Sequence, residues 1–235
     1  FLKKYKPWGV ILFSRNIKSI DQTYKLTSQI KKIFKDENYP ILIDEEGGKV
    51  SRLNKLIDNS IFSAEFFNNL YIKDKKKFYI YYNVYVKQIC YLLNLLGINI
   101  NTVPVLDVKR RITNKVIGNR SFSSNPFVVS KLGKICIKKY HENRIGTVIK
   151  HIPGHGLSKV DSHNKLPIIK ESINLLNKID FLPFKKQNSF LAMTAHIVYS
   201  SIDSKNTATH SPKVINIIRK KIGFKNIIMS DDISM

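Results

Sequence analysis

The stretch from Gly146 to Pro167, GTVIKHIPGHGLSKVDSHNKLP, decides how this chain is organised, because it joins a predicted strand to a loop rich in titratable groups. The run of Thr, Val and Ile at positions 147–149 follows a glycine and is typical of a strand. Proline and glycine at positions 153–156 argue against a helix after it. Binding and catalytic groups are often placed on a loop at the end of a rigid element. The functional site is therefore expected at this loop.

Asp161 and His163 lie two positions apart in this loop. In an extended backbone, side chains two apart project to the same side, so the carboxylate can hold one imidazole nitrogen. The other nitrogen is then free to move a proton near neutral pH. The competing interpretation is a polar surface turn, because Asp, Ser, His and Asn are ordinary loop residues. The pair alone leaves both interpretations open.

A zinc site is a third interpretation, because His151, His155, His163 and Asp161 supply nitrogen and oxygen ligands of the right kind. Histidines four apart usually bind a metal by sharing one face of a helix. The proline and glycine between the first two histidines argue against a helix there. We therefore expect no metal ion and no other cofactor.

Composition restricts the class of protein. The chain has 235 residues, with 40 Lys and Arg against 17 Asp and Glu, giving a formal charge of +23. The basic residues are spread along the chain without a nucleic-acid motif, so we expect neither a nucleic-acid partner nor a membrane partner. Its two cysteines imply no disulfide framework, and no apolar run approaches the roughly 20 residues of a membrane span. A reducing, cytoplasmic location is the resulting expectation.

The motif KHIPGHG, followed by DSH and LP, resembles the bacterial β-N-acetylglucosaminidase branch of glycoside hydrolase family 3. The resemblance extends over nearly the whole chain, and several motifs in the family's order are far more specific than any one of them. These further motifs are GVILFSRNI (Gly9 to Ile17), IDEEGGKVSRL (Ile43 to Leu53), GNRSFSSNP (Gly118 to Pro126), MTAHIVYSSID (Met193 to Asp203) and MSDDISM (Met229 to Met235).

Strands alternate with helices along the chain, and nearly every strand ends in a polar cluster. This pattern predicts an α/β fold of the parallel (β/α)8 TIM-like barrel type, with its site at the carboxyl ends of the strands. About six strands are visible where eight are expected, so we interpret residues 1–235 as one family 3 N-terminal catalytic barrel domain, truncated at both ends. The predicted strands are 8–13, 40–43, 99–108, 146–149, 190–195 and 226–229, and the predicted helices are 21–34, 74–96, 126–143, 171–178 and 211–221.

The resemblance implies a role for each site residue. Asp231 would be the carboxylate nucleophile of a retaining glycosidase, and neighbouring Asp232 should point elsewhere because side chains alternate along a strand. His163, oriented by Asp161, would be the proton donor. The residues implied to bind the terminal N-acetylglucosamine are Asp44, Arg52, Arg120, Lys150 and His151.

Three neighbouring positions carry weaker expectations. Glu45 departs from the glutamine that the family more often has, and we expect it to add a negative charge next to the sugar. His155 should shape the central loop. His196 is expected to line the pocket.

The resemblance also implies an activity: removal of terminal β-linked N-acetylglucosamine from muropeptides by a monomeric enzyme that acts on a small carbohydrate. One alternative is a phosphorylase, in which phosphate replaces water, because a neutral imidazole repels that anion less than a carboxylate does. The other alternative is an inactive or sugar-binding homologue.

Overall fold

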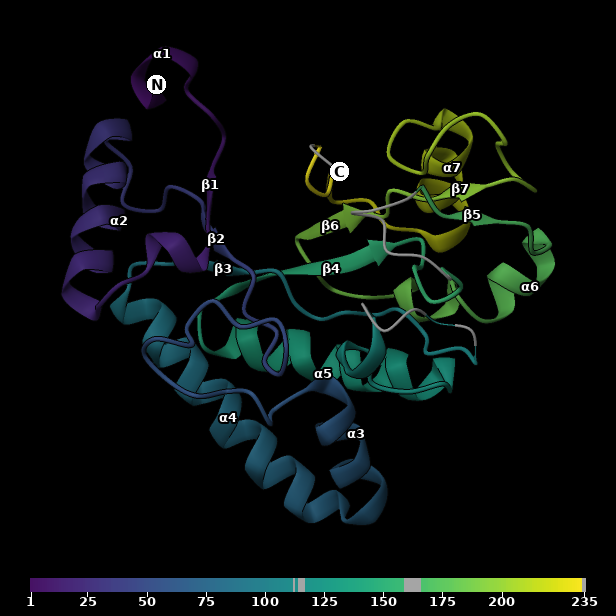
Figure 1. Ribbon diagram of the computed structural model, residues 1–235, viewed down its shortest axis with the longest axis horizontal. Coiled ribbons are helices and arrows are strands. Elements are labelled where there is room, and N and C mark those ends of the chain that lie inside the picture. Colours follow the sequence, from purple (N-terminus) through teal and green to yellow (C-terminus); the bar gives the residue numbers. More distant parts are fainter. Residues whose placement is uncertain (112, 114–116, 159–165, 234–235) are drawn as a thin grey trace.

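The computed structural model describes residues 1–111, 113, 117–158 and 166–233, and its centre is one curled sheet (Figure 1). The sheet has six strands in the order β1-β2-β3-β4-β6-β8, and every neighbouring pair is parallel. Strands thus follow one another around the curl in chain order, with helices in the connections. This is the incomplete parallel barrel that the sequence predicts. The strands are β1 Val10–Leu12, β2 Ile41–Ile43, β3 Ile100–Asn101, β4 Gly146–Ile152, β6 Leu191–Thr194 and β8 Ile227–Met229.

The helices begin where short polar side chains cap them. Ser19, Ser63, Asp74, Asn125 and Ser211 each accept a hydrogen bond from a backbone N–H in the first turn that follows. In Figure 1, α4 and α5 run below the sheet and α2 flanks β1. The helices are α1 Leu2–Tyr5, α2 Ile20–Phe34, α3 Ala64–Lys73, α4 Lys75–Leu95, α5 Pro126–Glu142, α6 Ile173–Lys178 and α7 Pro212–Ile217, with shorter turns η1 Ser14–Asn16, η2 Gly118–Arg120, η3 Leu182–Phe184 and η4 Ile218–Ile222.

The strands bury side chains on both faces. Ile41 and Ile43 of β2 belong to the main core shared with the helices. Leu42, between them, packs with Val148 and Met193 in a smaller cluster. Because successive side chains of a strand point to opposite faces, this second cluster lies inside the curl. Burial on both faces explains why the strands read as continuous apolar runs instead of alternating patterns.

Several sequence-based boundaries were wrong. Helix α2 begins at Ile20, one residue before the predicted start at position 21, and Ser19 caps it. The predicted 74–96 helix is correct to within one residue at each end, since α4 covers Lys75–Leu95. Helix α3 was missed, and so was a separate two-stranded sheet of β5 (Ile168–Ile169) with β7 (Val198–Tyr199). Short β-strands and a ten-residue helix give too few periods for a pattern to be recognised.

Both cysteines, Cys90 and Cys136, are buried and unpaired. Burial raises the pKa of each thiol to about 12, so neither is a ready nucleophile. Among the residues that the structure describes, every helix is too short or too polar to cross a bilayer.

Candidate active site

A cavity of about 610 Å³ lies at the carboxyl ends of the strands, the end where parallel barrels place their sites. Its apolar walls include Ile11 of β1, Met193 of β6 and Met229 of β8. Its polar walls bring together six of the eight predicted site residues, namely Asp44, Arg52, Arg120, Lys150, His151 and Asp231. The remaining two, Asp161 and His163, lie outside the described residues.

Lys150 is the charged centre of this cavity, although its side chain is only 2% exposed. Its Nζ contacts Asp44 Oδ1, Glu46 Oε1 at 2.5 Å and Thr102 Oγ1 at 3.0 Å. Burial alone would raise the pKa of Asp44, but Lys150 and the Thr102 hydroxyl hold it well below its usual range. Burial would lower the pKa of Lys150, yet the two carboxylates raise it. Both groups are therefore charged at neutral pH.

Strand β4 continues further than predicted and carries two of these residues. The sequence placed Lys150 and His151 in the loop, but they belong to a strand that extends to Ile152. The pairing of β4 with β6 shifts register between Lys150 and Ile152, and the peptide bond between Lys150 and His151 is cis. A register shift of this kind re-aims side chains at a strand end. Here both consecutive side chains line the cavity.

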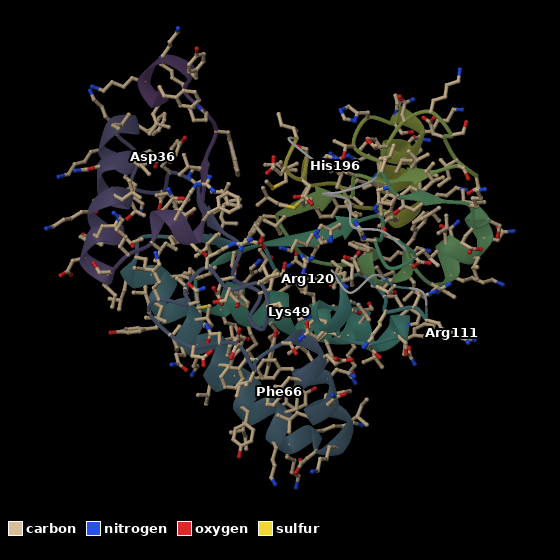
Figure 2. The ribbon with its side chains drawn as sticks, viewed as in Figure 1. Asp36, Lys49, Phe66, Arg111, Arg120 and His196 are labelled. Atoms are coloured by element: carbon tan, nitrogen blue, oxygen red, sulfur yellow. The ribbon has the colours of Figure 1, made fainter. Side chains whose placement is uncertain are left out.

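Arg120 is held by a two-point ion pair at the centre of the molecule (Figure 2). Its Nε donates to Glu46 Oε2 at 2.7 Å and its Nη2 donates to Glu46 Oε1 at 2.8 Å. Burial would lower the pKa of Arg120, but Glu46 raises it. A forked pair of this type fixes the plane of the guanidinium. Glu46 thus orients both Arg120 and Lys150, a role that the sequence did not assign.

Arg52 lies on the loop after β2 and donates from Nη2 to Asp44 Oδ2 at 2.8 Å. Its guanidinium also lies 5.4 Å from the centroid of the Phe13 ring, which lines the cavity. The two contacts hold Arg52 on the cavity wall beside Asp44. Asp44 is therefore neutralised on one oxygen by Lys150 and on the other by Arg52.

Glu45 was expected to place a negative charge beside the sugar, and this expectation is wrong. Its side chain is fully buried and does not line the cavity. Oε2 accepts hydrogen bonds from Ser51 Oγ and from the backbone N–H groups of Arg52 and Leu53, while Oε1 accepts one from Asn59. Burial raises the pKa of Glu45 despite these donors. The residue fastens the loop that carries Arg52.

Asp107 and His151 form a buried pair that sequence reasoning missed. Asp107 Oδ2 lies 2.7 Å from His151 Nδ1, and Oδ1 accepts the backbone N–H of His155 at 2.6 Å. Burial would raise the pKa of Asp107, but His151 lowers it. Burial also lowers the pKa of His155 to about 4, so His155 is neutral. His155 borders the cavity.

Asp231 follows β8 and faces His151, with 3.9 Å between His151 Nε2 and Asp231 Oδ2. Asp232 was expected to point away by strand alternation, but both aspartates line the cavity because β8 already ends at Met229. His196 was expected to line the cavity and does not. It lies instead near the C-terminal segment (Figure 2), where its Nε2 contacts the Asp232 carbonyl oxygen at 3.0 Å.

The arrangement can bind and fix a polyol, because fixed carboxylates and cations surround one cavity and offer both acceptors and donors to hydroxyl groups. Within the described part of the chain, no group of three or more His, Cys, Asp and Glu is placed to hold a metal ion. Two of the four ligands in the zinc interpretation, Asp161 and His163, lie outside that part.

Comparison with known proteins agrees with this geometry. The sequence profile described as "Glycosyl hydrolase family 3 N terminal domain" matches residues 1–235. The chain is 32% identical to Beta-hexosaminidase A of Pseudoalteromonas piscicida, over all of this chain and 42% of that protein. It is 33% identical to a Beta-hexosaminidase of Neisseria meningitidis, over 97% of this chain and 63% of that protein. The chain therefore spans less than two thirds of these relatives.

A solved structure extends the likeness to three dimensions. It is NagZ from Neisseria gonorrhoeae in complex with N-trifluoroacetyl-D-glucosamine, which superposes with a TM-score of 0.83 at 32% identity, covering 97% of this chain and 67% of that one. A profile match over the whole length, together with the curled parallel sheet, leads to one conclusion. The chain belongs to glycosyl hydrolase family 3.

Proposed function

We propose that this protein is a β-N-acetylglucosaminidase that releases a terminal β-linked N-acetylglucosamine unit with retention of configuration. The observation that carries the proposal is the position of Asp231, whose side chain is 26% exposed in the same cavity as the Asp44, Lys150 and Arg120 cluster. A carboxylate that substrate can reach, beside groups fixed to bind hydroxyls, is what a retaining glycosidase requires. The names of the relatives and the ligand of the NagZ complex support the same activity.

The binding step uses charges that are already oriented before substrate arrives. Asp44 is ionised and accepts hydrogen bonds from sugar hydroxyls, while Arg52 and Arg120 donate to the same ring. Each is already held in an ion pair within the site, so little freedom is lost when the sugar binds. Lys150 and His151 complete this set from the end of β4.

The chemical step begins when an Asp231 oxygen attacks the anomeric carbon. The bond from that carbon to the aglycone oxygen breaks, and His163 gives its proton to the departing oxygen. In the second step His163 takes a proton from water, the water oxygen attacks the anomeric carbon, and Asp231 is released as a carboxylate. Asp161 orients the imidazole. The roles of Asp161 and His163 rest on the family resemblance.

For the natural substrate we propose a muropeptide-derived saccharide in the cytoplasm, cleaved by a monomer without a cofactor. The test is hydrolysis of a nitrophenyl N-acetyl-β-glucosaminide, with product analysis in buffers with and without phosphate. Release of free N-acetylglucosamine in both buffers is the expected result. Formation of the sugar 1-phosphate would identify a phosphorylase instead, and activity that a chelator abolishes and zinc restores would identify a metal-dependent enzyme.

A further inference from the structure

The carboxylate of Asp107 is buried and makes three contacts with His151 and His155. Oδ2 contacts His151 Nδ1 at 2.7 Å, and Oδ1 accepts the backbone N–H groups of His151 at 3.3 Å and His155 at 2.6 Å. Asp107 is fully buried and is not part of the cavity wall. It therefore acts on whatever occupies the cavity only through its neighbours.

These contacts decide which nitrogen of His151 carries the proton. Burial would raise the pKa of Asp107, but the hydrogen bonds that it accepts from the His151 ring and from the backbone N–H of His155 lower it, so the carboxylate is charged and acts only as an acceptor. A ring nitrogen 2.7 Å from a carboxylate is held in its protonated form, which makes Nδ1 the N–H of the ring. Nε2 is then the nitrogen that faces the cavity, 3.9 Å from Asp231 Oδ2.

We propose that Asp107 is a positioning residue that holds His151 as the Nδ1–H tautomer, so that the bare Nε2 accepts a hydrogen bond from a substrate hydroxyl beside Asp231. This assignment rests on the proposed glycosidase function of the cavity. The other neutral tautomer would point an N–H at Asp231. A hydrogen bond to a carboxylate stabilises its charge and weakens it as a nucleophile. Asp107 thus keeps His151 available to substrate and Asp231 available for attack.

Asp107→Asn tests the proposal because asparagine has nearly the same shape as aspartate but carries an NH2 donor where aspartate has an oxygen acceptor. The two backbone N–H groups that meet at Oδ1 require an oxygen there, so the amide nitrogen of the asparagine occupies the position of Oδ2. That nitrogen donates to His151 Nδ1 and drives the proton to Nε2. The equivalent exchange in the serine protease triad costs about 10⁴-fold in turnover for the same reason.

The first measurement is independent of activity. In protein labelled with nitrogen-15 histidine, we expect the His151 signal, assigned by its loss in His151→Gln, to show Nδ1 protonated and Nε2 bare. In Asp107→Asn the two nitrogens should exchange these states. A wild-type His151 with Nε2 protonated, or with both nitrogens protonated at the assay pH, would overturn the proposal whether or not the protein is a glycosidase.

The second measurement uses kinetics and a double-mutant cycle. Asp107→Asn should lower kcat/KM by between about 10-fold and 10⁴-fold. The same change made in a His151→Gln background should cost less than about 3-fold, because Asp107 acts through that ring. Equal losses in both backgrounds would mean that Asp107 only holds the loop, and the positioning role would be lost.

Asp180→Asn is the matched control. Asp180 is another buried carboxylate under the same loop, with its side chain 1% exposed and 3.8 Å from Arg110. Burial raises its pKa to about 7, and in the described part of the chain neither of its oxygens accepts a hydrogen bond. This control should leave the His151 tautomer and kcat/KM unchanged. A shift of the His151 signals in Asp180→Asn as large as in Asp107→Asn would show that any buried charge acts on the ring, and would contradict the proposal.

Discussion

Arg120 and Glu46 form a two-point ion pair across 74 positions of sequence, with Nε–Oε2 and Nη2–Oε1 distances of 2.7 and 2.8 Å. The same carboxylate lies 2.5 Å from Lys150 Nζ. One buried acid therefore holds two of the cations that we propose to bind the sugar. The site depends on Glu46 although its side chain is not on the cavity wall.

Glu46→Gln should destabilise the protein strongly. The change leaves Arg120 and Lys150 buried with too little negative charge, and removing one partner of a buried pair costs about 3–5 kcal/mol. The free energy of unfolding, measured by urea denaturation, should fall by about 3 kcal/mol. Glu65→Gln is the control, because the Glu65–Lys109 pair is much more exposed than Glu46, with side chains 36% and 42% exposed, and its loss should cost at most about 1 kcal/mol. Equal effects of the two changes would contradict this account of Glu46.

Asp231→Ala should remove the nucleophile and lower turnover by several powers of ten, with the fold intact. Asp232→Ala, which alters the adjacent carboxylate on the same cavity wall, should lose far less. The measurement is peptide mass spectrometry after reaction with a fluorinated mechanism-based sugar, which traps the glycosyl-enzyme intermediate. We expect the label on Asp231, and a label on Asp232 would reverse the assignment.

His163→Ala should lower turnover most for substrates whose leaving group must be protonated in order to depart. Turnover of an alkyl or sugar glycoside should fall severely, and turnover of a dinitrophenyl glycoside much less, because only a poor leaving group requires the acid. Asp161→Asn should give the same ranking with smaller losses, since the imidazole remains but is misoriented. Equal losses on good and poor leaving groups would mean that this loop only binds substrate or supports the fold.

Glu45→Gln should change how stability depends on pH. Burial raises the folded-state pKa of Glu45 above its ordinary value of 4.5, so the folded protein binds this proton more tightly than the unfolded chain does. The contribution of Glu45 to stability is therefore complete below about pH 4.5 and is lost as pH rises through the folded pKa. Glutamine keeps an oxygen for the Ser51, Arg52 and Leu53 donors and carries no charge.

Urea denaturation of wild type and Glu45→Gln across this pH range measures the effect. Relative to the variant, the wild-type free energy of unfolding should decline from acid toward neutral pH and then level off. Asp203→Asn is a useful contrast, because hydrogen bonds from Ser211 and Asn206 lower the pKa of that exposed carboxyl. Its stabilising contribution should instead be lost as pH falls. If the wild-type free energy of unfolding instead rises relative to Glu45→Gln toward neutral pH, the four hydrogen-bond donors lower the pKa of Glu45 more than burial raises it.

The order of strands and helices was determined by the sequence, because apolar runs, caps and glycine or proline breaks are local features. The six strands of the sheet and the helix over Lys75–Leu95 follow from them. So does the arrival of the Asp44 and Asp231 motifs at one end of the sheet, since parallel strands place their carboxyl ends together. Membership of the family likewise follows from motifs that can be read along the chain.

The tertiary structure alone decided which charges pair and which side chains are buried. Glu45 and Glu46 are neighbours with the same chemistry, yet one fastens a loop and the other holds Arg120 and Lys150. Asp107 lies 44 positions from His151 and carries no local sign of its contact with that ring. Pair energies between charges depend on distance and burial, and both are set by packing between segments remote in sequence. The family motifs therefore identified where the site lies, and packing determined how its charges are held.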